Sequence, residues 1–232
     1  MKVTNNKKGI ILLSGGLDSV VSLAITKNEY KGIFALIFDY GQKAAKKELE
    51  AVNSISEFYR VSYKLITLPW LNEISQSALN KGDDIPIINE TELDDKQITQ
   101  SSAKAVWVAN RNALFLNIAA SFAESLGYDD IILGANKEEG ATFKDNSVEF
   151  IQAMNNLLKY SVNNEIKVQA PLIYMTKEEI VKKGIELNIP FELLYSCYNG
   201  TNKHCGKCES CLRFKRALKK SNRDDIIVKI FG

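Results

Sequence analysis

The sequence lacks the features of a membrane protein, a secreted protein and a bulk nucleic-acid-binding protein. None of its apolar runs approaches the ~20 residues of a membrane-spanning helix. The start, MKVTNNKKG, leads into a short strand without the hydrophobic region of a signal peptide. With 30 Lys and Arg against 28 Asp and Glu, the net charge of +2 gives no electrostatic basis for bulk nucleic-acid binding. The basic stretch 213–223 is interpreted as a solvated helix face. We therefore expect a cytoplasmic protein without a membrane or direct nucleic-acid partner.

Histidine and cysteine are scarce, which limits the catalytic and metal-binding roles that these residue types can have here. His204 is the only histidine, so the chain lacks a convincing histidine general base. Because disulfides are disfavoured in a reducing compartment, the cysteine spacing Cys-x7-Cys-x2-Cys-x2-Cys indicates a structural Zn²⁺ with all four positions filled. An iron–sulfur cluster and free thiols are the weaker alternatives. His204 is expected to be a surface neighbour of the metal and not a ligand. The predicted ligands are Cys197, Cys205, Cys208 and Cys211.

Short apolar runs alternate with amphipathic helical patterns along the 232 residues. Predicted strands cover residues 9–13, 33–38, 62–67, 130–136 with the following turn, and 166–173. Predicted helices cover residues 17–30, 43–60, 110–127, 147–161 and 176–189. Polar residues 69–100 are expected to form a long excursion over the sheet edge, as a lid would. This alternation predicts an α/β fold with a doubly wound, five-stranded parallel sheet over residues 1–190 and a small zinc-binding segment over residues 191–232.

The stretch SGGLDS, residues 14–19, lies between the first predicted strand and helix, where such sheets bind ligands. Its two glycines let the backbone approach a phosphate, and the helix N-terminus supplies free N–H groups. Ser14 and Ser19 add hydroxyl donors. Asp18 would repel phosphate, so we interpret it as a Mg²⁺ ligand or a helix cap. The stretch is not a lysine-bearing P-loop, and an ordinary capped turn is the alternative.

Two more loops at the same edge of the sheet carry polar residues. Asp39 follows the second strand and would hold a ribose hydroxyl or a metal, or form an Asx turn. Arg111 starts a mostly apolar helix and needs an anionic partner, from a ligand or from an acidic loop residue. After the fourth strand, Gly134 is expected to let a ligand approach. The polar residues that follow it suit a base edge or Mg²⁺, or simply form a solvated loop with a helix cap: Asn136, Glu138, Glu139, Thr142, Asp145 and Asn146.

Several segments resemble known families. SGGLDS resembles the PP-loop, SGGxDS, of ATP pyrophosphatases, which have the adenine nucleotide alpha hydrolase-like fold. Together with FDYGQ, NRNALFLNIAASFAE, TKEEIV and SCYNGTNKHCGKCESCLR, in this order, it resembles the QueC family of queuosine and archaeosine biosynthesis. The resemblance implies that ATP activates 7-carboxy-7-deazaguanine with release of pyrophosphate. Ammonia then forms an amide, and a second activation dehydrates the amide to the nitrile. A structural zinc and often a homodimer go with this family.

The resemblance also implies roles for individual residues. Asp18 and Arg111 would be catalytic, and Arg111 would lie where the deazapurine acid binds. Residues for ATP and Mg²⁺ would be Ser14, Gly15, Gly16, Asp18, Ser19, Asp39 and Gly134. Candidate substrate contacts are Tyr40, Arg111, Asn136, Glu138, Thr142, Phe143, Asp145 and Asn146.

Two departures from the common bacterial pattern leave the second substrate open. Lys43-Ala44 stands where Arg-His is usual, and EEGATFKDNS replaces a loop like SGYPDC, in a form that resembles archaeal-type members. A related ligase would conjugate the activated acid to a protein or another amine and stop at the amide. A PP-loop tRNA-modifying enzyme is a further alternative, although a thiolase needs a reactive cysteine and all four are assigned to metal. The last alternative is a module that binds ATP without catalysing a reaction.

Overall fold

The computed structural model describes residues 6–82 and 84–232, and its five strands form one parallel sheet. The strand order is β3-β2-β1-β4-β5, so the central β1 has Ile10 opposite Phe34 on one side and Ile131 on the other. This confirms the predicted five-stranded parallel sheet. The strands are β1 (Lys8–Leu12), β2 (Gly32–Asp39), β3 (Ser62–Thr67), β4 (Asp130–Ile132) and β5 (Lys167–Gln169). β5 is shorter than predicted because the chain turns at Pro171, which has no N–H for a ladder.

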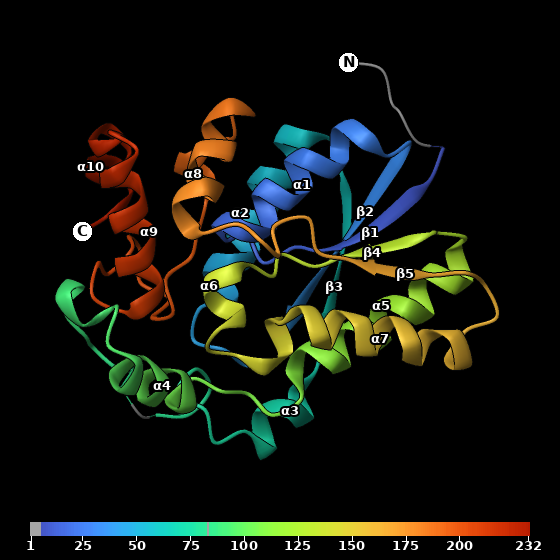
Figure 1. Cartoon of the computed structure of the whole chain (residues 1–232), viewed down its shortest axis with the longest axis horizontal. Coiled ribbons are helices and arrows are strands. Elements are labelled where there is room, and N and C mark those ends of the chain that lie inside the picture. Colours follow the sequence, from blue (N-terminus) through green and yellow to red (C-terminus); the bar gives the residue numbers. More distant parts are fainter. Residues whose placement is uncertain (1–5, 83) are drawn as a thin grey trace.

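Helices cover both faces of the sheet, as a doubly wound fold requires (Figure 1). On one face lie α1 (Leu17–Glu29) and α2 (Ala45–Tyr59), and on the other lie α5 (Arg111–Leu126) and α7 (Val148–Ser161). Side chains of the central strands, such as Ile11, Leu36 and Ile132, are therefore buried from both sides. The remaining helices near the site are α6 (Lys137–Gly140), the 3-10 turn η2 (Lys144–Asn146) and α8 (Lys177–Glu186).

Local signals for helix ends are confirmed in three places. Ser147 caps α7 by accepting from the Phe150 N–H, and Gly127 ends α5 with a φ of 67°. Thr176 and Glu179 form the predicted capping box of α8. The start of α2 is two residues later than predicted, at Ala45, because side-chain hydrogen bonds hold the preceding residues in a turn.

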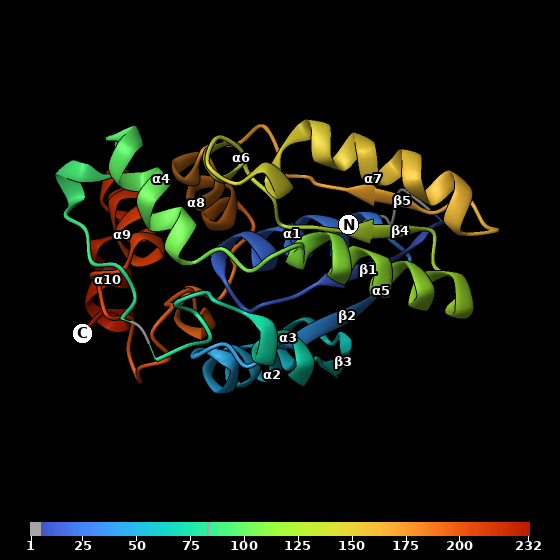
Figure 2. The ribbon, with the colours of Figure 1, turned by 90° about the horizontal axis from the view of Figure 1, so that it is seen from below.

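The polar excursion after β3 contains more helix than expected. It includes α3 (Pro69–Ile74), η1 (Glu90–Glu92) and α4 (Lys96–Ala105), which runs beyond the predicted end of the excursion. Its far half lies beside the C-terminal helix α9 (Glu209–Lys220) (Figures 1 and 2). There Leu93 packs with Leu212, and Arg216 makes two hydrogen bonds of 2.9 Å to Asp94. The excursion is thus fastened to the C-terminal segment.

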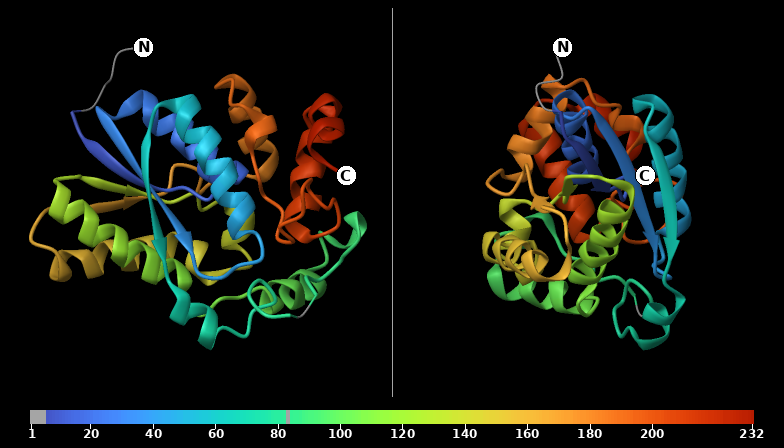
Figure 3. Two further views of the ribbon diagram at one scale, coloured as in Figure 1. Left: turned by 180° about the vertical axis from the view of Figure 1, so that it is seen from behind. Right: turned by 90° about the vertical axis from the view of Figure 1, so that its right-hand side faces the viewer.

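The C-terminal segment packs at the carboxyl end of the strands (Figure 3). It contains η3 (Phe191–Leu193), α9 and α10 (Asp224–Ile230). The Tyr195 N–H donates to the Gly15 carbonyl at 2.9 Å, and Phe214 belongs to the same hydrophobic core as β1. The division into domains at residue 190 stays a prediction. Among the described residues no helix has the length and apolar character needed to cross a bilayer.

Candidate active site

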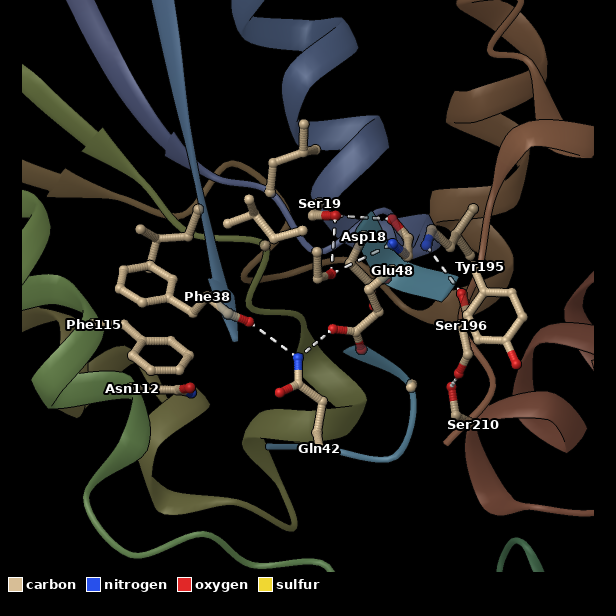
Figure 4. Close-up of a pocket in the computed structure, with 18 of the residues that line it drawn as sticks. Asp18, Ser19, Phe38, Gln42, Glu48, Asn112, Phe115, Tyr195, Ser196 and Ser210 are labelled. Carbon is tan, nitrogen blue, oxygen red and sulfur yellow. Dashed lines mark hydrogen bonds between the residues drawn. The ribbon is translucent and has the colours of Figure 1, made fainter. Parts of the chain in front are cut away.

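A cavity of about 250 Å³ opens at the carboxyl ends of β1, β2 and β4 (Figure 4). It brings together many residues that the sequence singled out: Ser14, Gly16, Asp18, Ser19, Tyr40, Arg111, Gly134, Glu139 and Asn146. It also contains side chains that sequence reasoning missed, from α2, α5, α8 and the C-terminal segment: Glu48, Asn112, Lys177, Tyr195, Ser196 and Tyr198. The expected convergence of the three loops is therefore present, and the C-terminal segment completes it.

The first loop has the geometry of an anion site. Gly15 has a φ of 80°, and a Cβ there would come within 2.9 Å of the Ala51 Cβ on α2, so this position requires glycine. Gly16 is the N-cap residue of α1 and has no side chain to cap it, and in the first turn the Leu17 N–H donates to Ser196 Oγ at 3.2 Å. The Ser19 hydroxyl donates to the Gly16 carbonyl and lies 3.2 Å from the Ser14 hydroxyl. The N–H groups of Asp18 and Ser19, in the first turn of α1, have no acceptor among the described residues, and both residues line the cavity, which suits a phosphate group.

Asp18 is held by an ion pair that the sequence did not reveal. Lys177 Nζ lies 2.6 Å from Asp18 Oδ2 and 3.0 Å from Glu139 Oε1. Asp18 Oδ1 is buried and has no hydrogen-bond partner among the described residues, and Asp18 does not cap α1, so the capping alternative is wrong. Burial raises the pKa of Asp18 to about 6, with Glu139 adding to the rise and Lys177 opposing it. An open, desolvated carboxylate oxygen fits a cation.

Arg111 stands at the start of α5 and faces the cavity, as predicted. Its Nη1 donates to the Tyr40 hydroxyl at 3.1 Å, and its guanidinium carbon lies 5.8 Å from the centre of the Tyr40 ring. Its Nε donates to Asn112 Oδ1 at 3.3 Å. No carboxylate among the described residues forms an ion pair with Arg111, so the internal salt bridge is not present. The remaining guanidinium donors suit an anionic ligand.

A glutamine and a glutamate, Gln42 and Glu48, form a second polar group in the cavity. Gln42 Oε1 accepts from the Tyr40 N–H at 3.0 Å. Gln42 Nε2 donates to the Phe38 carbonyl at 3.0 Å and to Glu48 Oε2 at 2.8 Å (Figure 4). Burial raises the pKa of Glu48 to about 7, opposed by the Gln42 hydrogen bond and by Arg111. The cavity therefore holds a carboxyl group that titrates near neutrality.

The loop after β4 packs closely against the first turn of α1. A Cβ at Gly134 would lie 2.9 Å from the Ser19 nitrogen and 3.0 Å from the Asp18 carbonyl carbon. Gly134 thus admits the first turn of α1 and also lines the cavity, and its contact with a ligand stays a prediction. Asn136 is 0% exposed and caps α6 by accepting from the Glu139 N–H.

Other predicted residues lie outside the cavity lining. Glu138 accepts from the Lys177 N–H at 2.7 Å and pairs with Arg213 at 3.1 Å. Asp39 Oδ1 accepts from the Gly41 N–H, which is the Asx turn. The residues that do not line the cavity are Gly15, Asp39, Asn136, Glu138, Thr142, Phe143 and Asp145. Their contacts with ligands stay predictions.

The four cysteine sulfur atoms lie within 4.8 Å of one another, which confirms the predicted cluster. Tetrahedral Zn²⁺ with Zn–S bonds of about 2.3 Å separates its sulfurs by roughly 3.8 Å, so the donor set fits this metal. Backbone N–H groups of Asn199 and Cys205 donate to Cys197 Sγ at 3.4 Å each. These donors favour the thiolate form that binds metal.

His204 is buried, which corrects the expectation of a surface position. It is 2% exposed, and its Nε2 accepts from the Ser196 N–H at 2.9 Å. Burial lowers its pKa, so the ring is neutral and acts as an acceptor. Ser196 Oγ in turn accepts from the Leu17 N–H at 3.2 Å. The histidine thus positions the segment that touches the first loop.

Comparisons with known proteins agree with this geometry. A family model described as queuosine biosynthesis protein QueC matches residues 8–222. The chain is 48% identical over 219 residues to the 7-cyano-7-deazaguanine synthase of Methanobrevibacter smithii, covering 94% of this chain and 96% of that protein. It is 45% identical over 221 residues to the 7-cyano-7-deazaguanine synthase of Bdellovibrio bacteriovorus, with the same coverage. A solved 4-thiouridine synthetase–RNA complex with bound ATP is 19% identical, with a TM-score of 0.50 and coverage of 96% of this chain and 52% of that one, and this likeness concerns the fold alone.

Proposed function

The chain belongs to the family of queuosine biosynthesis protein QueC, and we propose from this membership that it converts 7-carboxy-7-deazaguanine and ammonia to 7-cyano-7-deazaguanine with ATP. It is an ATP-dependent carbon–nitrogen ligase with a small-molecule substrate. The family match spans both the glycine loop and the cysteine cluster. Its relatives with the synthase name include an archaeal and a bacterial protein at similar identity.

One observation supports the proposal most strongly: the glycine loop, whose Asp18 and Ser19 N–H groups have no described acceptor, and Arg111, which forms no ion pair with a described residue, face the same cavity. The loop N–H groups and the Ser14 and Ser19 hydroxyls bind the phosphates of ATP. Arg111 binds the carboxylate of the deazapurine acid. A carboxylate oxygen then attacks the α-phosphorus, the bond to pyrophosphate breaks, and the loop stabilises the departing charge.

Asp18 would hold Mg²⁺ through its unpartnered Oδ1. The ion, when bound, neutralises charge on the phosphates. Lys177 would hold Asp18 Oδ2 so that Oδ1 faces the ion, since the ion pair leaves only one carboxylate oxygen open.

Zn²⁺ would be held by Cys197, Cys205, Cys208 and Cys211 and would have a structural role, because four thiolates leave no open coordination position. The contacts of this segment with Gly15 and Leu17, through Tyr195 and Ser196, support this structural role. A homodimer and a cytoplasmic location stay predictions.

The test is to incubate the purified protein with ATP, Mg²⁺, 7-carboxy-7-deazaguanine and ammonium and to analyse the products by mass spectrometry. We expect the nitrile, with AMP and pyrophosphate. Transfer of the activated acid to an added protein amine, with release of AMP and an end point at the amide, would favour the conjugating ligase. ATP binding without turnover would contradict the proposed enzyme.

A further inference from the structure

The proposed roles leave two described carboxyl groups of the cavity unused, those of Glu48 and Glu139, and Glu139 already pairs with Lys177. Glu48 lies in the first turn of α2, and Ala51, one turn later on the same helix face, packs against Gly15 of the phosphate loop. Glu48 lines the same cavity, and this packing places its helix turn beside the loop of residues 14–19.

Only one carboxylate oxygen of Glu48, Oε2, is held by a hydrogen bond from a described residue. Both donor positions of the Gln42 amide are used, one by the Phe38 carbonyl and one by Glu48 Oε2 (Figure 4). Glu48 makes no ion pair with any described residue, and no described residue hydrogen-bonds to its Oε1. The cavity thus has one held and one available carboxylate oxygen, with Arg111, Asp39 and Tyr40 as the charged or titratable groups that act on it.

The proposed reaction needs a proton acceptor at this place. Ammonium has no lone pair, so it must lose a proton before its nitrogen can attack. Among the other described carboxyl groups of the cavity, Asp18 and Glu139 pair with Lys177. Burial raises the pKa of the cavity tyrosines Tyr40, Tyr195 and Tyr198, which keeps their hydroxyls protonated. His204 lies outside the cavity lining and already accepts a hydrogen bond.

We propose that Glu48 is the catalytic base of the amide-forming step: it binds an ammonium ion and takes a proton from it. This inference rests on the proposed function. The freed lone pair forms the C–N bond with the adenylated carboxyl carbon, and the C–O bond to AMP breaks with its electron pair leaving on AMP. The nitrogen loses one further proton to solvent, and Glu48 later returns its own proton to solvent.

The pKa of Glu48, raised to about 7 by burial, suits this role, because a base works best when its pKa lies near the working pH. Binding of the ammonium ion needs the ionised carboxylate. The kcat/KM for total ammonium should therefore rise up to about pH 7 and then level off while ammonium is still protonated. An enzyme that captured only free ammonia would show a continued rise well above neutrality.

The test separates two half-reactions in the variant Glu48→Gln. Glutamine keeps the size of the side chain and a partner for Gln42 but cannot accept the proton. We expect the acid-dependent ATP–pyrophosphate exchange, which needs no ammonium, to be unchanged. We expect kcat/KM for ammonium to fall about 100-fold, with its plateau above neutrality lost. The matched control is Glu50→Gln on the same helix, where the glutamate is exposed and pairs with Lys47.

Two results would overturn the inference while leaving the proposed function intact. Unchanged ammonium kinetics in Glu48→Gln would show that the carboxylate takes no proton. Loss of the exchange reaction together with the amide step would show that Glu48 binds the acid or ATP. Thermal unfolding of the variant distinguishes both from a folding defect. Absence of any product from the wild-type protein would contradict the proposed function itself.

Discussion

Replacing Asp18 by asparagine is expected to abolish turnover and to make the protein more stable at neutral pH. Asp18 carries a negative charge in a desolvated position, with Oδ1 unpartnered among the described residues. Asparagine has the same shape without the charge. The variant therefore removes the proposed Mg²⁺ ligand together with the cost of its burial, and Lys177 keeps Glu139 as its partner at 3.0 Å.

The magnitude follows from the pKa of Asp18, which burial raises from 3.8 to about 6. A group whose folded-state pKa is raised contributes stability below its unfolded pKa and loses it as the pH rises through the folded pKa. The full difference of about two pKa units corresponds to about 3 kcal/mol in the free energy of unfolding. Because the asparagine side chain does not titrate, the variant escapes this loss. Roughly half of this difference, about 1 kcal/mol, falls between about pH 5 and pH 8.

The assay is urea unfolding of both proteins, followed by circular dichroism, in Mg²⁺-free buffer across this pH range. Changes linked to zinc affect both proteins and cancel in the difference. The control is Asp225→Asn in α10, where Arg223 lowers the pKa of Asp225, so its difference from wild type stays constant above about pH 5. A difference for Asp18→Asn that stays constant or shrinks as the pH rises would refute the reasoning, as would full activity of the variant.

Two further variants test the zinc segment and the contact between two loops. Cys208→Ser is expected to lower zinc content and the thermal unfolding temperature, with any loss of turnover following the loss of folded protein. An inactive variant with unchanged stability would contradict a structural role. Gly134→Ala is expected to lower the free energy of unfolding by about 1–3 kcal/mol and to weaken ATP binding. Its Cβ would lie 2.9 Å from the backbone of α1, and backbone cannot move aside as a side chain does. Gly32→Ala is the control, since its Cβ would meet only the Lys8 side chain at 3.7 Å, and equal effects of both variants on unfolding in urea and on ATP affinity would show that this contact does not matter.

The parts of the fold that could be predicted depend on local chemistry. Buried strands have continuous apolar runs, and the caps at Ser147 and Thr176 depend on residues three positions away. The first loop was recognisable because its glycines, serines and aspartate are consecutive. The cysteine cluster was recognisable because its ligands lie within fifteen residues.

The missed features depend on contacts between distant residues. Lys177 pairs with Asp18 across 159 positions, and nothing in either local sequence indicates the partner. His204 is buried by packing on Tyr195 and Phe231, which a pattern of cysteine ligands does not predict. Gly134 serves a close approach to α1 that only the packed structure shows.

Glu48 is different, because a signal for it was present. It shares the spacing of Ala51, Val52 and Ile55, the buried face of α2, and an acidic residue on a buried helix face needs a reason. The late start of α2 also depends on a polar side chain near its N-terminus. The Gln42 amide hydrogen-bonds to the Tyr40 N–H and the Phe38 carbonyl, so Gln42 stays in the preceding turn and does not join the helix.

The bond from Leu17 to Ser196 has a consequence for how the chain is made. Leu17 and Ser196 are 179 residues apart, so Ser196 leaves the ribosome roughly 10–40 s after Leu17. During that time the growing polypeptide contains the loop of residues 14–19 but not Tyr195 and Ser196, which hydrogen-bond to Gly15 and Leu17 in the folded protein. Unfinished chains should therefore compete poorly for cellular nucleotide, and the capacity to hold it should arise only as synthesis nears its end.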